Sequence, residues 1–159
     1  MDLCNLFLLL FALSSITLQL AYGSCPSRWT RHESSCYHFS HDTESAIVAN
    51  LACQQLGGTL VEIGSVSENT FIAGSIKNKQ GNSWWIGLND LKEEGVWVWM
   101  GSKSPASYFN WRAGEPNNVG NNENCVVMDK GKEQWVDGPC HNVLPYICET
   151  NATETEIIG

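Results

Sequence analysis

The chain has few basic residues for its length. Lysine and arginine together number 9 in 159 residues, against 17 aspartates and glutamates, and the formal net charge is −8. Nucleic acids and anionic membranes are bound through basic surfaces that neutralise phosphate groups. We therefore expect neither nucleic acid nor an anionic membrane as the main partner, and no insertion into a membrane. An acidic balance of this kind is compatible with divalent cations.

Catalytic sequence motifs are also missing. The chain contains no His-Glu-x-x-His helix of the zinc proteases and no Gly-x-Ser-x-Gly turn of the serine hydrolases. Its four histidines follow no such pattern and are interpreted as surface residues: His32, His38, His41 and His141. No internal repeat is present. We predict that the protein is not an enzyme.

One segment near the N-terminus lacks charge altogether. Residues 3–21 contain no Asp, Glu, Lys or Arg and are rich in leucine. Ala21-Tyr22-Gly23 places small residues where a signal peptidase cuts, so residues 1–23 are predicted to be a signal peptide for a secreted, extracellular protein. The alternative is a retained membrane anchor, because Asp2 stands where basic residues usually precede a signal sequence.

Cysteines are frequent outside this segment. Cys4 lies within the predicted signal peptide, and six cysteines remain in the mature chain: Cys25, Cys36, Cys53, Cys125, Cys140 and Cys148. An even number of cysteines in a secreted chain indicates disulfide bonds. Six cysteines allow about fifteen pairings, and the count does not choose among them.

The mature chain has the length and apolar content of one domain, within which two helices are expected. Residues 43–56 show a helical period that Gly57-Gly58 ends. Ser65 and Glu68 have the spacing of a capping box at the start of a second helix. The predicted apolar side of the first helix consists of Ala46, Ile47, Leu51 and Cys53, and that of the second of Phe71, Ile72 and Ile76.

Strands are expected on both sides of a long loop. Residues 25–39 predict a hairpin, and short apolar runs predict further strands at 59–63, 84–88, 96–100, 126–128 and 146–148, with another beginning at Trp135. Residues 101–124 are rich in Ser, Gly, Pro and Asn and predict a functional loop. The core tryptophans are expected to be Trp85, Trp97, Trp99 and Trp135, with Trp84 or Trp111 exposed.

Side chains that carry oxygen gather between residues 115 and 140. This segment reads Glu115-Pro116-Asn117, then Glu123-Asn124-Cys125, then Trp135-Val136-Asp137 and Cys140. Ca²⁺ takes about six to eight oxygen ligands from carboxylates, amide carbonyls and water. The segment therefore predicts a calcium site. Taken alone, Glu-Pro-Asn-Asn is also an ordinary turn sequence, because Pro and Asn favour turns.

Together these triplets resemble the carbohydrate-recognition domain of the C-type lectins, in which EPN, Glu-x-Cys and WND motifs bind calcium and, through it, a sugar. The resemblance runs from about Cys25 to Glu149 and includes Trp85-Ile86-Gly87-Leu88, Asn110-Trp111 and Tyr146-Ile147-Cys148-Glu149. It implies an α+β fold of two helices with small antiparallel sheets, a long ligand loop and three disulfides. The lectin domain would span residues 24–149, followed by a flexible acidic tail at 150–159.

The resemblance also assigns pairings and ligands. It selects the disulfides Cys25–Cys36, Cys53–Cys148 and Cys125–Cys140, and it implies a cis peptide bond between Glu115 and Pro116. The primary calcium and sugar ligands implied are Glu115, Asn117, Glu123 and Asp137. A second calcium position is implied at Asp90, Glu94, Asn118 and Glu123, with Asn118 standing where an aspartate is common.

The order of Glu and Asn around the proline is the one that the resemblance associates with mannose, glucose, N-acetylglucosamine and fucose. Val136 departs from the family pattern, which has an asparagine there. The carbonyl oxygen of that asparagine binds calcium and its amide donates to the sugar, and valine can do neither. We therefore expect a weaker calcium site and a weakened or shifted sugar preference, because water can fill a vacant calcium position.

The function expected from this likeness is calcium-dependent binding of glycans on microbial or host surfaces, with a role in innate immunity that rests on analogy with secreted invertebrate lectins. Because one sugar site binds weakly, agglutination requires a homo-oligomer or multivalent presentation. The alternative is a non-sugar module of the same fold, with an extracellular matrix, mineral or protein ligand. Asn151-Ala152-Thr153 is an N-glycosylation sequon, which predicts a glycoprotein.

Overall fold

The computed structural model describes residues 23–153. The predicted signal peptide up to residue 22 and the tail from residue 154 lie outside the described residues. The chain divides into two compact units, the larger of which is Cys25–Ala152. In the other unit, Ser24 and Thr153 exchange backbone hydrogen bonds of 2.9 and 3.1 Å. Within residues 23–153, no helix combines the length and apolar character needed to cross a bilayer.

Residues 25–152 contain two helices and two antiparallel sheets, which confirms the predicted α+β fold. In chain order the elements are β1 (Thr30–His32), β2 (Ser35–Phe39), α2 (Ala46–Gln55), β3 (Thr59–Leu60), α3 (Val66–Ile76), β4 (Ser83–Asn89), β5 (Val98–Trp99), the 3₁₀ turn η1 (Val119–Asn121), β6 (Cys125–Asp129), β7 (Gln134–Gly138) and β8 (Ile147–Asn151).

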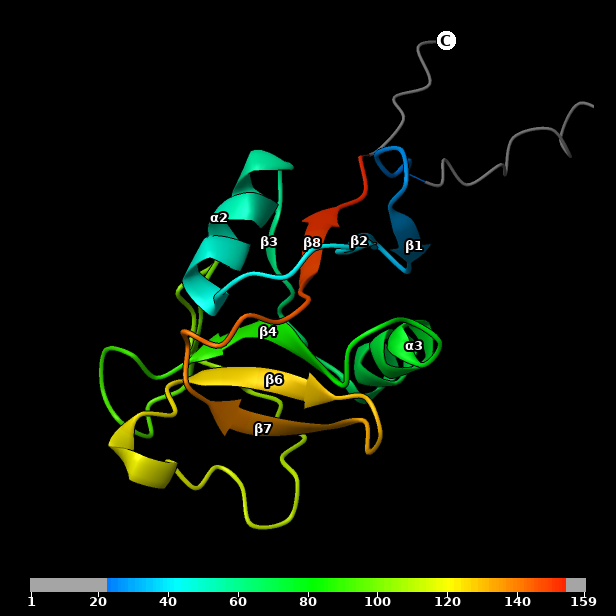
Figure 1. Cartoon of the computed structure of the whole chain (residues 1–159). Coiled ribbons are helices and arrows are strands. Elements are labelled where there is room, and N and C mark those ends of the chain that lie inside the picture. The colour runs from blue at the N-terminus through cyan, green and yellow to red at the C-terminus, as the bar shows by residue number, and fades with distance from the viewer. Residues whose placement is uncertain (1–22, 154–159) are drawn as a thin grey trace, which may run out of the picture. The chain divides into compact units, whose positions relative to one another are not determined.

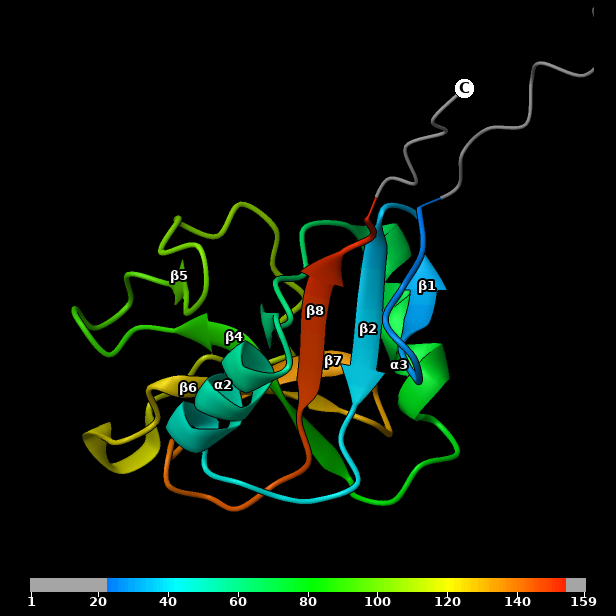
Figure 2. The same ribbon diagram turned by 90° about the horizontal axis from the view of Figure 1, so that it is seen from above.

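The strands form two separate sheets. One has the strand order β1-β2-β8-β3, and the other has the order β5-β4-β6-β7. Figure 2 shows β2 and β8 side by side, with α2 and α3 on opposite sides of this pair. In Figure 1 the loop that carries η1 lies at the end of β6 and β7 that is away from α3. The second sheet therefore positions the predicted ligand loop.

The sheets meet at Gly87. The Val61 N–H donates to the Ile147 carbonyl of the first sheet at 2.9 Å, and the Val61 carbonyl accepts from the Gly87 N–H of β4 at 2.8 Å. A Cβ atom at Gly87 would lie 2.8 Å from the Leu60 carbonyl oxygen. Glycine is therefore required by the close approach of two backbones. The Val61 carbonyl thus bonds to β4 and not to β8. Strand β3 therefore ends at Leu60 and not at residue 63 as predicted.

Tryptophans fill much of the core. Trp84, Trp85 and Trp135 are fully buried, so the prediction that Trp84 is a candidate for exposure is wrong. Trp97 and Trp111 are partly buried and pack against the core cluster. The Trp135 indole N–H donates to Asn69 Oδ1 at 2.8 Å, which satisfies both buried groups.

The buried side of helix α2 matches the predicted one only at Ala46 and Cys53. Its buried residues are Ala46, Ala49 and Cys53. Ile47 and Leu51 are 46% and 52% exposed, so their predicted burial is wrong. Cys53 is bonded to Cys148 of β8, and this bond fixes which side of the helix faces the sheet. Small residues on that side let the helix pack closely against the sheet.

Helix α3 begins with the predicted cap. Ser65 Oγ accepts the Glu68 N–H at 3.2 Å. The Glu68 carboxylate reaches the Gly64 N–H at 2.9 Å, one residue before the position expected for a capping box. Its other oxygen accepts the Tyr37 hydroxyl at 2.8 Å. The cap therefore also connects α3 to β2.

All three disulfides implied by the resemblance are present: Cys25–Cys36, Cys53–Cys148 and Cys125–Cys140. The predicted hairpin at 25–39 is the β1–β2 pair, in which Arg31 lies opposite Cys36. Strand β8 continues through Thr150 and Asn151, which differs from the predicted flexible tail because these two residues pair with β2. The Asn151 side chain is exposed.

Candidate functional site

The loop between β5 and β6 carries the EPN triplet in a tightly turned backbone. The Glu115–Pro116 bond is cis, as the resemblance implied. Asn118 has a φ of 44° and Gly120 a φ of 71°, in the left-handed region that Asn and Gly adopt most readily. These residue types allow the chain to reverse at η1 and bring residues 117–123 together.

Asp137 of β7 anchors this turn to the sheet. It pairs with Val126 of β6, and only 3% of its surface is exposed. Its Oδ2 accepts the Asn118 N–H at 2.8 Å, and both carboxylate oxygens accept the Asn117 N–H, at 3.1 and 3.2 Å. A buried carboxylate with several backbone donors is held rigidly. The sheet thus fixes the position of the EPN loop.

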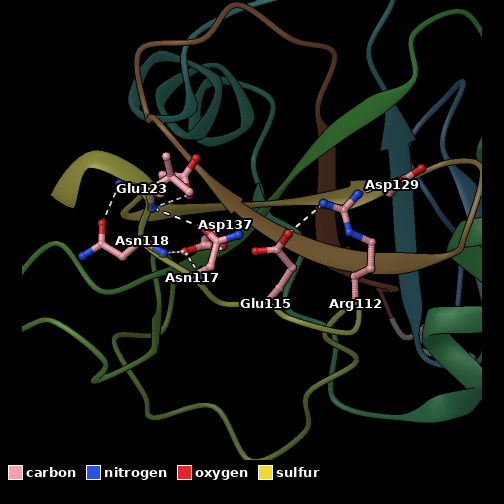
Figure 3. A network of polar contacts seen from close by, with 8 residues as sticks. Arg112, Glu115, Asn117, Asn118, Glu123, Asp129 and Asp137 are labelled. Atoms are coloured by element: carbon pink, nitrogen blue, oxygen red, sulfur yellow. Dashed lines mark hydrogen bonds and ion pairs between the residues drawn. The ribbon is translucent and has the colours of Figure 1, made fainter.

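The other side chains of the turn accept hydrogen bonds from its backbone. The Val119 N–H donates to Glu123 Oε2 at 2.8 Å and to Asn117 Oδ1 at 3.1 Å. Asn118 Oδ1 accepts the Glu123 N–H at 3.1 Å. Figure 3 shows Asn117, Asn118, Glu123 and Asp137 as one group. The structure therefore brings together three of the four predicted primary ligands, Asn117, Glu123 and Asp137. It also brings together two residues of the predicted second position, Asn118 and Glu123.

Glu115 lies between Asp137 and Arg112 (Figure 3). Its side chain is only 5% exposed. Oε1 accepts a hydrogen bond from Arg112 Nη2 at 2.7 Å, whereas Oε2 is buried without a hydrogen-bond partner. Burial raises the pKa of Glu115; the Arg112 hydrogen bond opposes this shift, and the neighbouring Asp137 carboxylate adds to it. A pair of close carboxylates of this kind favours a cation.

Arg112 is a residue of the candidate site that the sequence did not reveal. Its Nη1 lies 3.4 Å from Asp129 Oδ2 of β6, and its backbone N–H donates to the Trp135 carbonyl of β7 at 2.9 Å. The only sequence signal was a basic residue three positions before Glu115. Its contact with Asp129 joins residues 17 apart in the chain, and spacing alone does not reveal such a contact.

Val136 lies on β7 opposite Val127 and packs, partly buried, against the apolar cluster that includes Cys125. Trp135 and Asp137 are its neighbours along the strand. Val136 therefore contributes an apolar contact and no oxygen ligand, as its residue type dictates.

The residues of the predicted second calcium position are only partly assembled. Asp90 is 2% exposed; its Oδ2 accepts the Gly95 N–H at 2.8 Å, and its Oδ1 is buried without a partner. The Asp90 N–H donates to the Asn124 carbonyl at 3.2 Å, which brings this turn to the start of β6. Glu94 is exposed, and among the described residues no hydrogen bond or ion pair joins it to Asn118 or Glu123.

The donor set fits a hard cation better than a soft one. Among residues 23–153, no three His, Cys, Asp or Glu side chains are grouped in a way that could hold a metal by themselves. The EPN loop adds the amide oxygens of Asn117 and Asn118, and the unpaired Oε2 of Glu115 and Oδ1 of Asp90 are buried carboxylate oxygens. Calcium accepts such mixed oxygen sets and completes its shell with water. The residues therefore fit Ca²⁺, with few charged ligands.

Comparisons with known proteins bear on the family of this chain. The sequence model of the family described as lectin C-type domain matches residues 42–150. The low affinity immunoglobulin epsilon Fc receptor of Mus musculus is 42% identical over 134 residues, which are 84% of this chain and 39% of the receptor. This chain thus spans well under half of that relative. The perlucin-like protein of Mytilus galloprovincialis is 38% identical over 131 residues, covering 79% of this chain and 82% of that protein.

Solved structures share the fold. The cow C-type carbohydrate-recognition domain of CD23, crystallised in the presence of GlcNAc2Man3 oligosaccharide, has a TM-score of 0.75 at 37% identity and covers 82% of this chain and 98% of that one. A calcium-independent type II antifreeze protein has a TM-score of 0.73 at 28% identity, covering 82% and 96%. With the family match over most of its length and the shared fold, this chain belongs to the C-type lectin domain family.

Proposed function

We propose that this chain is a secreted, calcium-dependent lectin of the mannose, glucose, N-acetylglucosamine and fucose type. Family membership supports carbohydrate binding in general terms. The observation that carries the finer proposal is the pair formed by Asp137, which fixes the EPN loop through the Asn117 and Asn118 N–H groups, and Glu115, whose buried Oε2 has no partner. Glu115, Asn117, Glu123 and Asp137 would hold both Ca²⁺ and the sugar.

The chain's own residues would do most of the positioning. When bound, calcium supplies coordination sites for two neighbouring hydroxyl groups of a sugar. Glu115 accepts, and the Asn117 amide donates, hydrogen bonds to the same hydroxyls, and charge assistance makes these bonds directional. Asp137 keeps the loop in place through backbone donors. Asp90, Glu94, Asn118 and Glu123 would form a second, weaker site, supported by the unpaired Asp90 Oδ1.

Secretion is part of the proposal. Three disulfides support an oxidising compartment, since such bonds are rare in the cytosol. The exposed Asn151 side chain supports N-glycosylation of its sequon. Glycans on microbial or host surfaces would be the partners, with a role in innate immunity. A homo-oligomer or multivalent presentation would supply the avidity that one weak site lacks.

Isothermal titration tests this proposal. Ca²⁺ is titrated first into metal-free protein, and methyl α-mannoside is then titrated with calcium or with EDTA. We expect saturable calcium binding and sugar heat only with calcium. Glu115→Gln should weaken both, because it removes the charge from a ligand. Glu133→Gln is the matched control: its side chain is exposed in the β6–β7 turn, so the variant should bind like wild type. Sugar binding that survives EDTA would refute calcium dependence.

The second candidate is a non-sugar module of the same fold, with an extracellular matrix, mineral or protein ligand. Two observations favour it: Val136 offers no ligand, and Arg112 already neutralises Glu115 without a metal. The antifreeze protein that shares this fold is itself calcium-independent. A glycan array with and without EDTA separates the two candidates. No glycan signal in millimolar calcium would favour the non-sugar module.

A further inference from the structure

Arg112 and Glu115 form the shortest ion pair among the described residues, and it lies within the proposed site. Arg112 Nη2 is 2.7 Å from Glu115 Oε1, and the two side chains are 34% and 5% exposed. Arg112 also reaches Asp129 of β6 at 3.4 Å and is held to β7 through its backbone N–H. The guanidinium is thus fixed between the sheet and the EPN loop.

In the metal-free protein, this pair compensates the buried charge of Glu115. A carboxylate that is almost fully buried is costly unless it is paired, and Glu115 also faces the carboxylate of Asp137. Arg112 engages only one of the two oxygens of Glu115. The other, Oε2, is left buried without a partner. The pair therefore neutralises Glu115 and leaves its second oxygen available.

We propose that Arg112 is a resident counter-ion and positioning residue for Glu115. It neutralises the Glu115 carboxylate and orients that side chain when calcium is absent, and it lowers the affinity of the site for calcium. This role rests on the proposed calcium-dependent function. The site would therefore be preformed but weak, suited to the high calcium concentrations outside cells, where other calcium-binding modules also bind with low affinity.

Repulsion between the Arg112 guanidinium and a bound calcium ion is the reason why Arg112 should weaken calcium binding. A cation bound to Oε2 would share one carboxylate with the guanidinium, and like charges at such short range repel strongly in a partly buried site. Removing Arg112 also removes its help in orienting Glu115. That loss is the smaller effect, because the backbone of the loop remains fixed by Asp137 through three hydrogen bonds.

Calcium titration of Arg112 variants tests whether Arg112 lowers the affinity of the site for calcium. We expect Arg112→Gln to lower the calcium Kd about tenfold relative to wild type. Arg112→Lys keeps the charge and should stay close to wild type. Lys132→Gln is the matched control, since Lys132 is an exposed cation of the β6–β7 turn and its removal changes the net charge equally. An unchanged or higher Kd for Arg112→Gln would overturn the counter-ion role.

Thermal unfolding in EDTA tests, without any calcium, whether Arg112 is the counter-ion of Glu115. Arg112→Gln should lower the Tm because it leaves Glu115 buried and unpaired. The double variant Arg112→Gln/Glu115→Gln should recover part of that loss. If wild type binds no calcium, the proposed function fails, yet these melts still decide whether the pair stabilises the metal-free protein. A Tm equal to that of wild type, or a double variant no more stable than Arg112→Gln, would refute the role.

Discussion

At the scale of single residues, Val136 shows that membership of the family and binding of calcium depend on different parts of the chain. Family membership rests on the whole chain, whereas calcium affinity rests on a few oxygens. Val136 packs partly buried against a cluster that includes Cys125 and Val127, so it stabilises the hairpin that carries Asp137 while providing no ligand. Val136 therefore supports the β6–β7 hairpin and supplies no side-chain oxygen to the proposed site.

We predict that Val136→Asn strengthens calcium binding at least about tenfold, because it adds an amide oxygen beside Asp137. The same change should lower the free energy of unfolding in EDTA by about 1 kcal/mol, since a partly buried apolar side chain becomes polar. Calcium titration and urea unfolding measure the two effects. Val136→Thr, which is close in shape, serves as the control. If calcium and mannoside affinities stay at their wild-type values, the missing amide is not what limits the site.

Glu149 of β8 makes stability depend on pH. Burial raises its pKa, and the charges of Glu68 and Glu62 add to the shift, although its carboxylate accepts the Ser35 hydroxyl at 2.7 Å and the Glu62 N–H at 3.1 Å. With a pKa raised in the folded state, the folded protein binds more protons than the unfolded protein just above the ordinary pKa of 4.5. The free energy of unfolding therefore falls as pH rises through this window.

We expect Glu149→Gln to remove this component. Urea midpoints measured from acid to neutral pH should decline for wild type across the window and decline less for the variant, which has no group to ionise there. Glu133→Gln, in an exposed turn, should keep the wild-type profile. Parallel profiles for wild type and Glu149→Gln would show that Glu149 titrates at the same pKa in both states.

At the scale of elements, α2 shows how a covalent bond decides packing. The helix has apolar residues on more than one side, and its period does not tell which side is buried. The Cys53–Cys148 bond selects Ala46, Ala49 and Cys53 and leaves Ile47 and Leu51 outside. These two line a groove of about 550 Å³ with Leu91 and Met100. Periodicity thus predicted the helix and the burial of Ala46 and Cys53 correctly, whereas it wrongly predicted burial of Ile47 and Leu51.

Helix α3 depends on the Ser65 cap, which was predictable because it is local. Ser65→Ala removes the acceptor for the Glu68 N–H and should lower the free energy of unfolding by about 1 kcal/mol. Chemical denaturation measures the change. Ser67→Ala, on the exposed first turn of the same helix, should cost less than about 0.5 kcal/mol. Equal losses for the two variants would mean that the cap contributes no more than any surface serine.

At the scale of the whole molecule, the structural features that could be predicted from the sequence are those that local patterns or the family motifs determine. The helices, the hairpin, the strand at 84–88 and the cis Glu115–Pro116 bond follow from short stretches of chain or from the resemblance. The features that were missed depend on contacts between distant segments. The early end of β3 depends on Gly87, and the role of Arg112 depends on Asp129 and Glu115 in three dimensions.

A disulfide that encloses a longer stretch of chain should contribute more to stability, and the increase is logarithmic in the length of that stretch. Cys53–Cys148 spans 95 residues and Cys25–Cys36 spans 11. In the entropy model, the long bridge stabilises the fold by about 4–5 kcal/mol and the short one by about 3 kcal/mol, because a larger loop restricts the unfolded chain more.

We predict that Cys53→Ala/Cys148→Ala lowers the urea midpoint clearly more than Cys25→Ala/Cys36→Ala. Small domains have free energies of unfolding of about 5–15 kcal/mol, so loss of the long bridge should leave a marginal fold. Both alanine pairs lose sulfur atoms, and the comparison therefore cancels much of the packing effect. An equal or opposite ranking would show that native packing, and not restriction of the unfolded chain, governs how these bridges stabilise the domain.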